Sequence, residues 1–311
     1  MRVFFALARP FTLLPPALGM LSGALAALGT LPREQGTAGR AAGMMVLGAL
    51  MAAALNAASN TLNQVHDLAL DRVNKPERPL PRGVVTSRRA CQFAALWYAV
   101  ALALSWMLGP PGAHEVFWIV VLTAGLTWAY SAPPFRCRNS WWLAPLVIAI
   151  PRGLLLKVAG WGAVADIAAD REPWVLGGIF FLFVLGGAAI KDFEDMEGDA
   201  LGGASSLPLR FGRERAARMM SLALVLPWVL LAATPWICWE GRPLLSIPPV
   251  AALASGLFIA LLGLVAARSL LGMARASADK ASARQAWRML YLQMMAAQVL
   301  TAAGYWWPSQ A

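Results

Sequence analysis

The sequence predicts an all-α integral membrane protein with about nine transmembrane helices, forming a single domain over residues 1–311. Three observations support this fold class: 59% of the residues are hydrophobic, only 14% are charged, and apolar segments recur along the whole chain. A soluble domain of this size usually has about 25% charged residues, and a globular core cannot bury so much apolar surface. Lipid offers the backbone no hydrogen-bond partners and no segment alternates like a barrel strand, so each span is expected to be helical.

The apolar segments are long enough to cross a bilayer, which takes about 17–25 residues. The expected spans are residues 10–31, 42–66, 89–108, 115–131, 141–164, 173–194, 216–238, 245–271 and 285–307. The fourth is short and the ninth is the least apolar, so eight spans is the alternative count. Arg9-Pro10 interrupts the first apolar run, which favours a retained span over a cleaved signal peptide.

The basic residues are distributed unequally between the two sides of these spans. If the N-terminus is cytoplasmic, the cytoplasmic loops carry about five times as many Lys and Arg residues as the opposite loops, as the positive-inside rule requires. The net charge of +10 therefore reflects topology, and no nucleic-acid partner is expected. Abundant alanine, with arginine in excess of lysine, suggests a bacterial cell inner membrane.

An acidic cluster closes the second span. Asn63, Asp67 and Asp71 are spaced i, i+4, i+8, so a continuous helix would place them on one face. A second cluster, Asp192, Asp195 and Asp199, closes the sixth span with i+3 and i+4 steps. Both clusters end even-numbered spans and therefore reach the same side of the membrane.

Carboxylates in this arrangement are typical of diphosphate chemistry. Mg²⁺ is usually held by one or two carboxylates together with substrate phosphates, and it stabilises the charge of a departing diphosphate. Either cluster alone is also explained by solvated loop charges paired with neighbouring arginines. Two clusters of matching spacing on one membrane face are much less readily explained that way. They are not helix caps, because acids at a helix C-terminus oppose the helix dipole.

A weak internal repeat follows the two clusters. Leu80-Pro81-Arg82-Gly83 and the later segment 207–212 each join an acidic helix end to a basic helix start. This similarity predicts two pseudo-related four-helix halves, formed by spans one to four and five to eight.

These motifs resemble those of the UbiA-type family of intramembrane prenyltransferases over nearly the whole chain. The first family motif is matched by Asn63, Asp67, Asp71 and Arg72, followed by the loop Asn74-Lys75-Pro76-Glu77-Arg78-Pro79-Leu80-Pro81-Arg82-Gly83. The second is matched by Asp192, Asp195 and Asp199, the loop after the fourth helix by Tyr130-Ser131-Ala132-Pro133-Pro134 with Arg136, and the family's usual opening by Ala8-Arg9-Pro10-Phe11-Thr12. One departure is Gln64, which stands where many members have aspartate.

The resemblance implies a helical bundle around a central cavity that opens laterally to lipid. There Mg²⁺, with Mn²⁺ as an alternative, would bridge a prenyl diphosphate to the protein. The implied metal ligands are Asn63, Asp67, Asp71, Asp192, Asp195 and Asp199, and the implied diphosphate contacts are Asn63, Arg72, Lys75, Arg78, Arg136 and Lys191. Catalytic roles are implied for Asp67, Asp71, Asp195, Asp199 and Tyr130. Tyr130 would flank the allylic cation, whereas without the motif it would be explained as an interfacial tyrosine.

Two basic residues lie within the fifth span, where an ionisable side chain usually faces a cavity. Arg152 follows Pro151, which is expected to kink the helix. It either binds an acid group of the acceptor or balances a cluster aspartate, and both interpretations stay open. Arg9 and Ser131 are the other expected acceptor contacts, and Lys157 is expected to snorkel to the outer face.

The second cluster resembles family members that act on homogentisate-type rings, chlorophyllide or prenylglycerol phosphates. The predicted activity is C-prenylation of an aromatic acceptor on the route to a prenylquinone or related lipid. O-prenylation of a glycerol-phosphate lipid is the alternative. A secondary transporter is a remote alternative. The charges of a transporter gather near the bilayer midplane, whereas the six acidic and amide residues of the two clusters are expected at one membrane face. The expected partners are a prenyl diphosphate, the aromatic or lipid acceptor, and membrane lipid.

Overall fold

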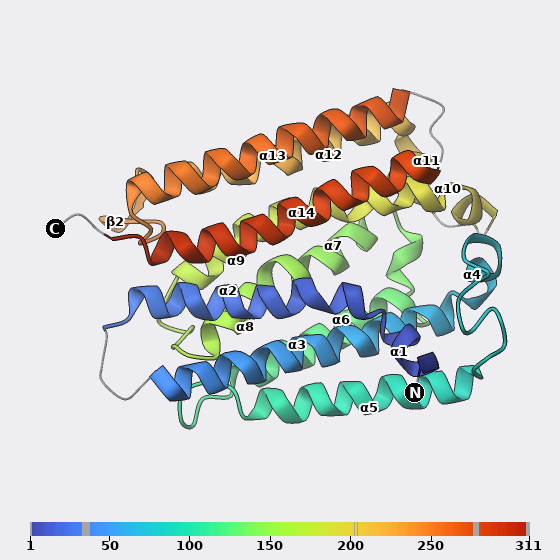
Figure 1. Cartoon of the computed structure of the whole chain (residues 1–311), viewed down its shortest axis with the longest axis horizontal. Coiled ribbons are helices and arrows are strands. Elements are labelled where there is room, and N and C mark those ends of the chain that lie inside the picture. The colour runs from blue at the N-terminus through green and yellow to red at the C-terminus, as the bar shows by residue number, and fades with distance from the viewer. Residues whose placement is uncertain (1, 33–37, 202, 204, 276–279, 309–311) are drawn as a thin grey trace.

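The protein is a bundle of long, roughly parallel helices (Figure 1). The computed structural model describes residues 2–32, 38–201, 203, 205–275 and 280–308. The helices of the described part are α1 (Arg2–Ala8), η1 (Pro10–Leu13), α2 (Leu14–Thr30), α3 (Ala38–His66), α4 (Leu68–Asn74), α5 (Ser87–Trp106), α6 (Glu115–Ser131), η2 (Cys137–Asn139), α7 (Leu143–Ala149), η3 (Ile150–Leu155), α8 (Leu156–Gly162), α9 (Glu172–Gly187), η4 (Ala188–Lys191), α10 (Asp192–Leu201), α11 (Leu207–Phe211), α12 (Arg213–Ala233), α13 (Pro249–Arg275) and α14 (Lys280–Tyr305). The predicted class, an all-α membrane protein, is confirmed.

Six helical segments of the described part are long and apolar enough to cross a membrane, and Glu115–Ser131 is a shorter apolar helix. The two remaining expected spans correspond to α5 and α14, which form helices of 20 and 26 residues. The count of nine spans stays a prediction. A short hairpin between α12 and α13 was not predicted; its strands β1 (Cys238–Trp239) and β2 (Arg242–Pro243) pair Cys238 with Pro243 and Trp239 with Arg242.

The apolar core has two main parts, which share α2 and α8. One is built on α9, α12, α13 and α14, and the other on α3, α5 and α6. The shared helices α2 and α8 approach closely, because glycines line their contact. A Cβ on Gly23 would lie 2.7 Å from the Lys157 carbonyl oxygen, and one on Gly160 would lie 2.6 Å from that of Met20. Small residues of this kind allow membrane helices to pack backbone against backbone.

The fifth expected span consists of three successive segments, α7, η3 and α8. The middle segment, Ile150–Leu155, is a π-helix that contains Pro151 and Arg152. Pro151 has no N–H to donate, and π-helical turns are frequent at functional sites. The expected irregularity at Pro151 is therefore present, and Arg152 lies within it.

The short helices that carry the acidic motifs lie at one end of the bundle. Figure 1 shows α1, α4, α10 and α11 at this end, whereas α14 finishes at the opposite end beside the hairpin. Contacts between α4 and α10 bring the two motif-bearing segments together. A polar site at this end of the bundle is the consequence.

Candidate active site

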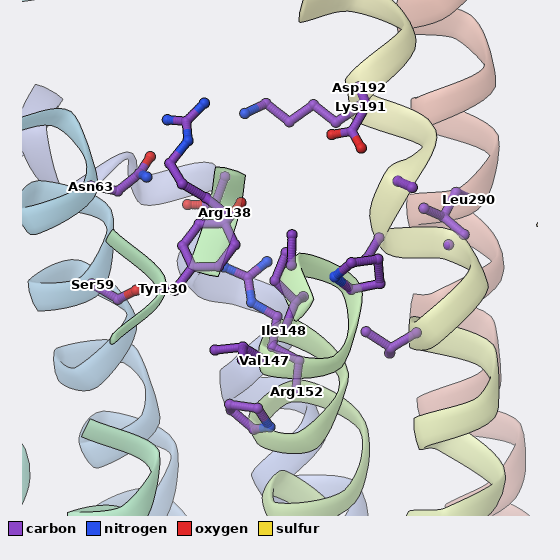
Figure 2. A pocket seen from close by; sticks show the side chains of 18 of the residues that line it. Ser59, Asn63, Tyr130, Arg138, Val147, Ile148, Arg152, Lys191, Asp192 and Leu290 are labelled. Atoms are coloured by element: carbon purple, nitrogen blue, oxygen red, sulfur yellow. The ribbon is translucent and has the colours of Figure 1, made fainter. Parts of the chain in front are cut away.

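A cavity of about 250 Å³ opens among α2, α3, α6, α7, α9 and α14. Its walls are polar beside α10 and become apolar toward the middle of the bundle, where Ile148, Phe183 and Met294 line it. Figure 2 shows Asn63, Tyr130, Arg138 and Asp192 facing the polar region from different elements. The cavity thus joins a charged end to an apolar interior.

The first acidic cluster is divided by the structure. Asn63 and Asp67 line the cavity. Asp71 is buried but does not line it, and both of its carboxylate oxygens accept hydrogen bonds of 2.7 Å from Arg78 Nη1. The expected column of three ligands is therefore interrupted, because Asp67 forms a turn between α3 and α4. In this structure Asp71 fixes the loop that carries Arg78.

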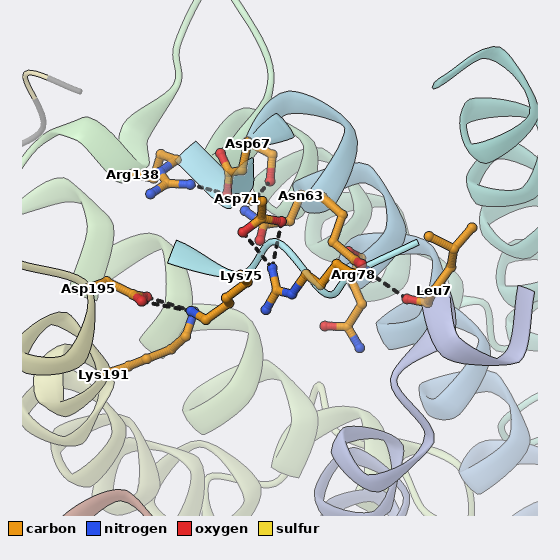
Figure 3. Close-up of polar contacts among 12 residues, drawn as sticks. Leu7, Asn63, Asp67, Asp71, Lys75, Arg78, Arg138, Lys191 and Asp195 are labelled. Carbon is orange, nitrogen blue, oxygen red and sulfur yellow. Dashed lines mark hydrogen bonds and ion pairs between the residues drawn. The ribbon is translucent and has the colours of Figure 1, made fainter. Parts of the chain in front are cut away.

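The second cluster lies wholly in the cavity wall, to which Asp192, Asp195 and Asp199 all contribute. Asp195 forms ion pairs with Lys75, at 2.7 Å, and with Lys191, at 3.4 Å. Lys75 belongs to the loop after the first cluster, so this contact ties the two motifs together across the site (Figure 3). The structure therefore brings both motifs to one cavity.

Arg138 is a central residue of the site that the sequence analysis missed. Its Nη1 pairs with Asp67 Oδ2, and its Nη2 lies 3.4 Å from Asp199 Oδ1, so one guanidinium bridges the two clusters. In the sequence it stands two residues after Arg136 in the loop that follows the fourth span, where it had the appearance of a topology charge. The signal available was its place in a loop that already carried a family motif.

Burial dominates the electrostatics at this end of the cavity. It raises the pKa of the Asp67 carboxyl above its ordinary value, although the Arg138 guanidinium acts in the opposite direction. Burial likewise raises the pKa of Asp199, again against Arg138. Burial and the positive charges of Arg78 and Arg152 lower the pKa of Arg9 to about 10. Ionised groups here therefore need counter-charges.

One carboxylate oxygen still has room for a ligand. Asp67 Oδ1 is buried and has no hydrogen-bond partner among the described residues. Among the described residues, no group of three or more His, Cys, Asp or Glu side chains is arranged so that it could hold a metal ion by itself. The reason is visible in Figure 3, where basic side chains separate the carboxylates. This arrangement suits an ion that arrives together with phosphate oxygens.

Arg152 projects into the cavity near Tyr130 (Figure 2). Its guanidinium has no hydrogen bond or ion pair with any residue in the described ranges. The interpretation in which it balances a cluster aspartate is therefore wrong for this structure. A free guanidinium inside a bilayer-spanning segment is costly, which favours a negatively charged ligand as its partner.

Several other expected site residues lie outside the cavity wall. Arg72 is exposed, and Arg136 Nη2 donates to the His66 carbonyl oxygen at 3.1 Å. Ser131 is fully buried behind Asn63, whose Nδ2 lies 3.5 Å from its hydroxyl. Arg9 and Lys191, by contrast, do line the cavity. Arg72, Arg136 and Ser131 therefore do not contribute to the cavity wall in this structure.

The snorkelling expected of Lys157 is wrong. The side chain is 1% exposed, its Nζ pairs with Ser22 Oγ and Gln298 Oε1, and it lies 4.0 Å from the centre of the Phe180 ring. Gln64 also points away from the site, because its Nε2 donates to the Leu7 carbonyl oxygen at 2.8 Å. Five described residues of α14 that no motif indicated do line the cavity, namely Trp287, Leu290, Tyr291, Met294 and Gln298.

Comparison with known proteins places these features in context. The model of the UbiA prenyltransferase family matches residues 13–297. The chain is 30% identical to the bacteriochlorophyll synthase 33 kDa chain of Cereibacter sphaeroides over 78% of this chain and 76% of that protein. It is 30% identical to digeranylgeranylglyceryl phosphate synthase of Thermococcus kodakarensis, over 80% and 83%. Homogentisate phytyltransferase of Synechocystis is 31% identical, over 64% and 65%.

Solved structures show the same architecture. A UbiA homologue from Archaeoglobus fulgidus, bound to DMAPP and Mg²⁺, superposes with a TM-score of 0.66 at 17% identity. The superposition covers 96% of this chain and 99% of that one. At this identity the likeness establishes a shared fold over almost the full length.

Proposed function

The chain belongs to the UbiA prenyltransferase family and is a membrane prenyltransferase, and on this premise we propose that it transfers a prenyl group from a prenyl diphosphate to an aromatic acceptor with the help of Mg²⁺. The observation that carries the proposal is the meeting of two acidic motifs and several basic side chains in one cavity with an apolar interior. A diphosphate has the charge, and a prenyl chain has the hydrophobicity, that such a cavity fits.

The oxygen donors in the wall suit a hard divalent cation. Asn63, Asp67, Asp192, Asp195 and Asp199 line the cavity and would hold Mg²⁺, or Mn²⁺ in its place. The unpartnered Asp67 Oδ1 supports this fit, since a buried carboxylate oxygen needs a partner. When bound, the ion supplies positive charge that stabilises the departing diphosphate. Asp71, held by Arg78, supports the loop instead.

The basic side chains at the same end would contact the phosphate oxygens that the ion leaves free. Lys191 and Arg138 line the cavity, and Lys75 reaches the same group of contacts through Asp195. Charge-assisted hydrogen bonds from such groups are among the stronger polar interactions. They would orient the diphosphate so that the first carbon of the prenyl chain points toward Tyr130. The aromatic face of Tyr130 then stabilises positive charge on that carbon.

The acceptor would enter beside Arg152. A ring carbon forms the new bond to the allylic carbon while the carbon–oxygen bond breaks, the diphosphate leaves with the electron pair, and the ring loses a proton. The apolar cavity limits access of water, which would otherwise quench the cation. Arg152, with Arg9, would hold a carboxylate or phosphate on the acceptor. The homogentisate phytyltransferase among the relatives supports the aromatic acceptor.

A glycerol-phosphate lipid is the second candidate acceptor. The digeranylgeranylglyceryl phosphate synthase relative supports it, and its phosphate would equally satisfy Arg152. In both cases the orientation we propose has the N-terminus and the site on the cytoplasmic side of the cell inner membrane, as the loop charges indicate. A lateral opening to lipid, as the family resemblance implies, would then serve the hydrophobic substrate or product.

The test is direct. Purified protein in detergent is incubated with a labelled prenyl diphosphate, Mg²⁺, and either an aromatic acid or a glycerol-phosphate lipid as acceptor. We expect release of diphosphate and a prenylated product, identified by mass spectrometry, with the aromatic acceptor preferred. An intact diphosphate under all conditions, or full activity in excess EDTA, would contradict the proposal.

A further inference from the structure

A second, smaller cavity leads away from the active site. It has a volume of about 60 Å³ and lies among α2, α3, α6, η3 and α8. Its wall shares Pro16, Ser59, Thr127, Pro151, Arg152 and Leu156 with the main cavity. The two cavities therefore adjoin, and Arg152 lies in the part of the wall that both share.

A row of residues along α3 connects the charged end to this apolar branch. Asp67, Asn63 and Ser59 line the main cavity, and Ser59, Leu55 and Met51 line the branch. These residues are spaced by four, so each lies about 40° round the helix from the last and the row winds gradually about the α3 axis. At 1.5 Å per residue, the path from Asp67 to Met51 is about 24 Å long. It runs from the diphosphate site toward the middle of the bilayer.

The branch offers little to a polar ligand. Asn56 Nδ2 already donates to the Thr12 carbonyl oxygen at 2.8 Å. The Thr127 hydroxyl bonds to the Ala124 carbonyl oxygen and to the Tyr98 hydroxyl, each at 2.9 Å. With these groups satisfied, the remaining surface beyond Arg152 is mainly apolar. A hydrocarbon chain is the ligand chemistry that this surface fits.

Two methionines bound the branch at its deep end. Met20 and Met51 are each 2% exposed, and both line the branch. Met20 fits there because α3 has glycine at position 48, where a Cβ would lie only 2.6 Å from the Met20 Cε. The end of the branch therefore depends on a close contact between α2 and α3.

Building on the proposed function, we propose that this branch holds the tail of the prenyl diphosphate and that Met20 and Met51 limit its length. The diphosphate lies at the Asp67 end, the reacting carbon near Tyr130, and the tail follows α3 past Arg152. The acceptor then occupies the α14 side of the main cavity, which Trp287, Tyr291 and Gln298 line. Met20 and Met51 are thus specificity-determining residues, and they act on the tail far from the reacting atoms.

The experiment measures binding and needs no acceptor. Thiolo-diphosphate analogues with geranyl, farnesyl and geranylgeranyl tails are titrated with Mg²⁺ into the full-length protein in detergent by calorimetry. Met20→Ala and Met51→Ala should improve the affinity for the longest tail relative to geranyl by about tenfold, the ratio expected when roughly two more methylene groups are buried. Ala52→Leu, which narrows the branch, should change this ratio in the opposite direction.

Met219→Ala is the matched control, because Met219 is 47% exposed on α12 and lines neither cavity. An unchanged tail preference in the folded Met20 and Met51 variants would overturn the proposal, and a changed preference in Met294→Ala would place the tail beside α14 instead. If the alanine variants fail to fold, the tail preference of Ala52→Leu provides the test, and an unchanged affinity ratio in that variant would overturn the proposal. Absence of Mg²⁺-dependent binding of every analogue by the wild-type protein would instead contradict the proposed function.

Discussion

Lys75 Nζ lies 2.7 Å from Asp195 Oδ1, although the two residues are separated by 120 positions in the chain. Lys75 belongs to the loop after the first acidic motif, and Asp195 is the middle residue of the second. Both side chains are 15% exposed, so the pair is partly shielded from solvent. The contact joins the two motifs directly and holds them within reach of one substrate.

Neutralising an aspartate in either motif should abolish most of the activity. Asp67→Asn and Asp195→Asn keep the shape of the side chain and remove the charge that would hold Mg²⁺. We expect turnover to fall by roughly 100-fold or more, as in other sites where charge stabilisation of the leaving group is lost. The measurement is steady-state release of diphosphate at saturating substrates, together with circular dichroism of each variant.

Asp166→Asn is a suitable control for these variants. Asp166 is exposed, lies outside the cavity, and bonds to the Ala168 backbone N–H at 2.7 Å, a bond that asparagine can also accept. Its turnover should remain near the wild-type value. Full turnover in either site variant would argue against a metal-binding role for that aspartate.

Arg138 should affect both the binding of the prenyl diphosphate and the stabilisation of the protein by Mg²⁺. In Arg138→Gln the guanidinium that bridges Asp67 and Asp199 is gone, so the two carboxylates are left without their shared counter-charge. We expect the melting temperature to fall without Mg²⁺ and to recover more on Mg²⁺ addition than in the wild type. KM for the prenyl diphosphate should also rise about tenfold, because a charged phosphate contact is lost.

Melting curves at several Mg²⁺ concentrations measure the first effect, and initial rates measure the second. Arg136→Gln is the control, because Arg136 bonds to a backbone carbonyl oxygen outside the cavity. If Mg²⁺ stabilises Arg138→Gln no more than the wild type, the two carboxylates do not share an ion.

The sequence was sufficient for the fold class and for the general location of the site. Long apolar segments leave helices as the only solution in lipid, and motif spacing identified Asp67, Asp192, Asp195 and Asp199, which do meet at one cavity. What the spacing could not predict was the break at Asp67, a turn that separates α3 from α4. That break removes Asp71 from the cavity wall.

The roles of basic side chains were harder to predict, because charge alone does not reveal a partner. Arg138 and Arg136 stand in the same loop, yet one bridges the acidic clusters and the other bonds to backbone. Lys157 illustrates the same difficulty within a span. Its place near the outer end of the span suggested snorkelling, whereas the rotation of α8 turns its side chain inward, toward Ser22 and Gln298. Such rotations depend on neighbouring helices that hydropathy does not identify.

Arg152 should determine how tightly an acidic acceptor binds. In Arg152→Ala, KM for an acceptor with a carboxylate should rise by roughly 10- to 100-fold, the range expected for a lost charge-assisted hydrogen bond. KM for the prenyl diphosphate should change much less. Kinetics with an aromatic acid and with its methyl ester provide the comparison, since the ester has no charge for Arg152 to bind.

Arg152→Lys retains the charge and should recover part of the loss with the acid. An equal rise in KM for both acceptors, or for the acceptor and the prenyl diphosphate alike, would reject the proposed contact. The comparison with the ester separates this role from a general disturbance of the π-helical turn, which would affect both acceptors.

Substitutions of Lys157 and of its buried partner Ser22 should have strongly non-additive effects on the stability of the protein. Lys157→Met keeps the length of the side chain beside Phe180 but removes an ammonium group that has no acidic partner among the described residues. Since an unpaired buried charge is costly, we expect this variant to melt at or above the wild-type temperature. Ser22→Ala should be destabilising by about 1–3 kcal/mol in the wild-type background, because it removes one of the hydrogen-bond acceptors of Lys157.

The same Ser22→Ala change should cost clearly less in the Lys157→Met background. There the ammonium is absent, and only the contacts that Ser22 Oγ makes as a donor are lost, to Gln298 Oε1 at 2.7 Å and to the Gly19 carbonyl oxygen at 3.1 Å. Melting temperatures of the four proteins in one detergent form a double-mutant cycle, which isolates the coupling between the two side chains. Equal losses in both backgrounds would mean that Ser22 stabilises the bundle independently of Lys157.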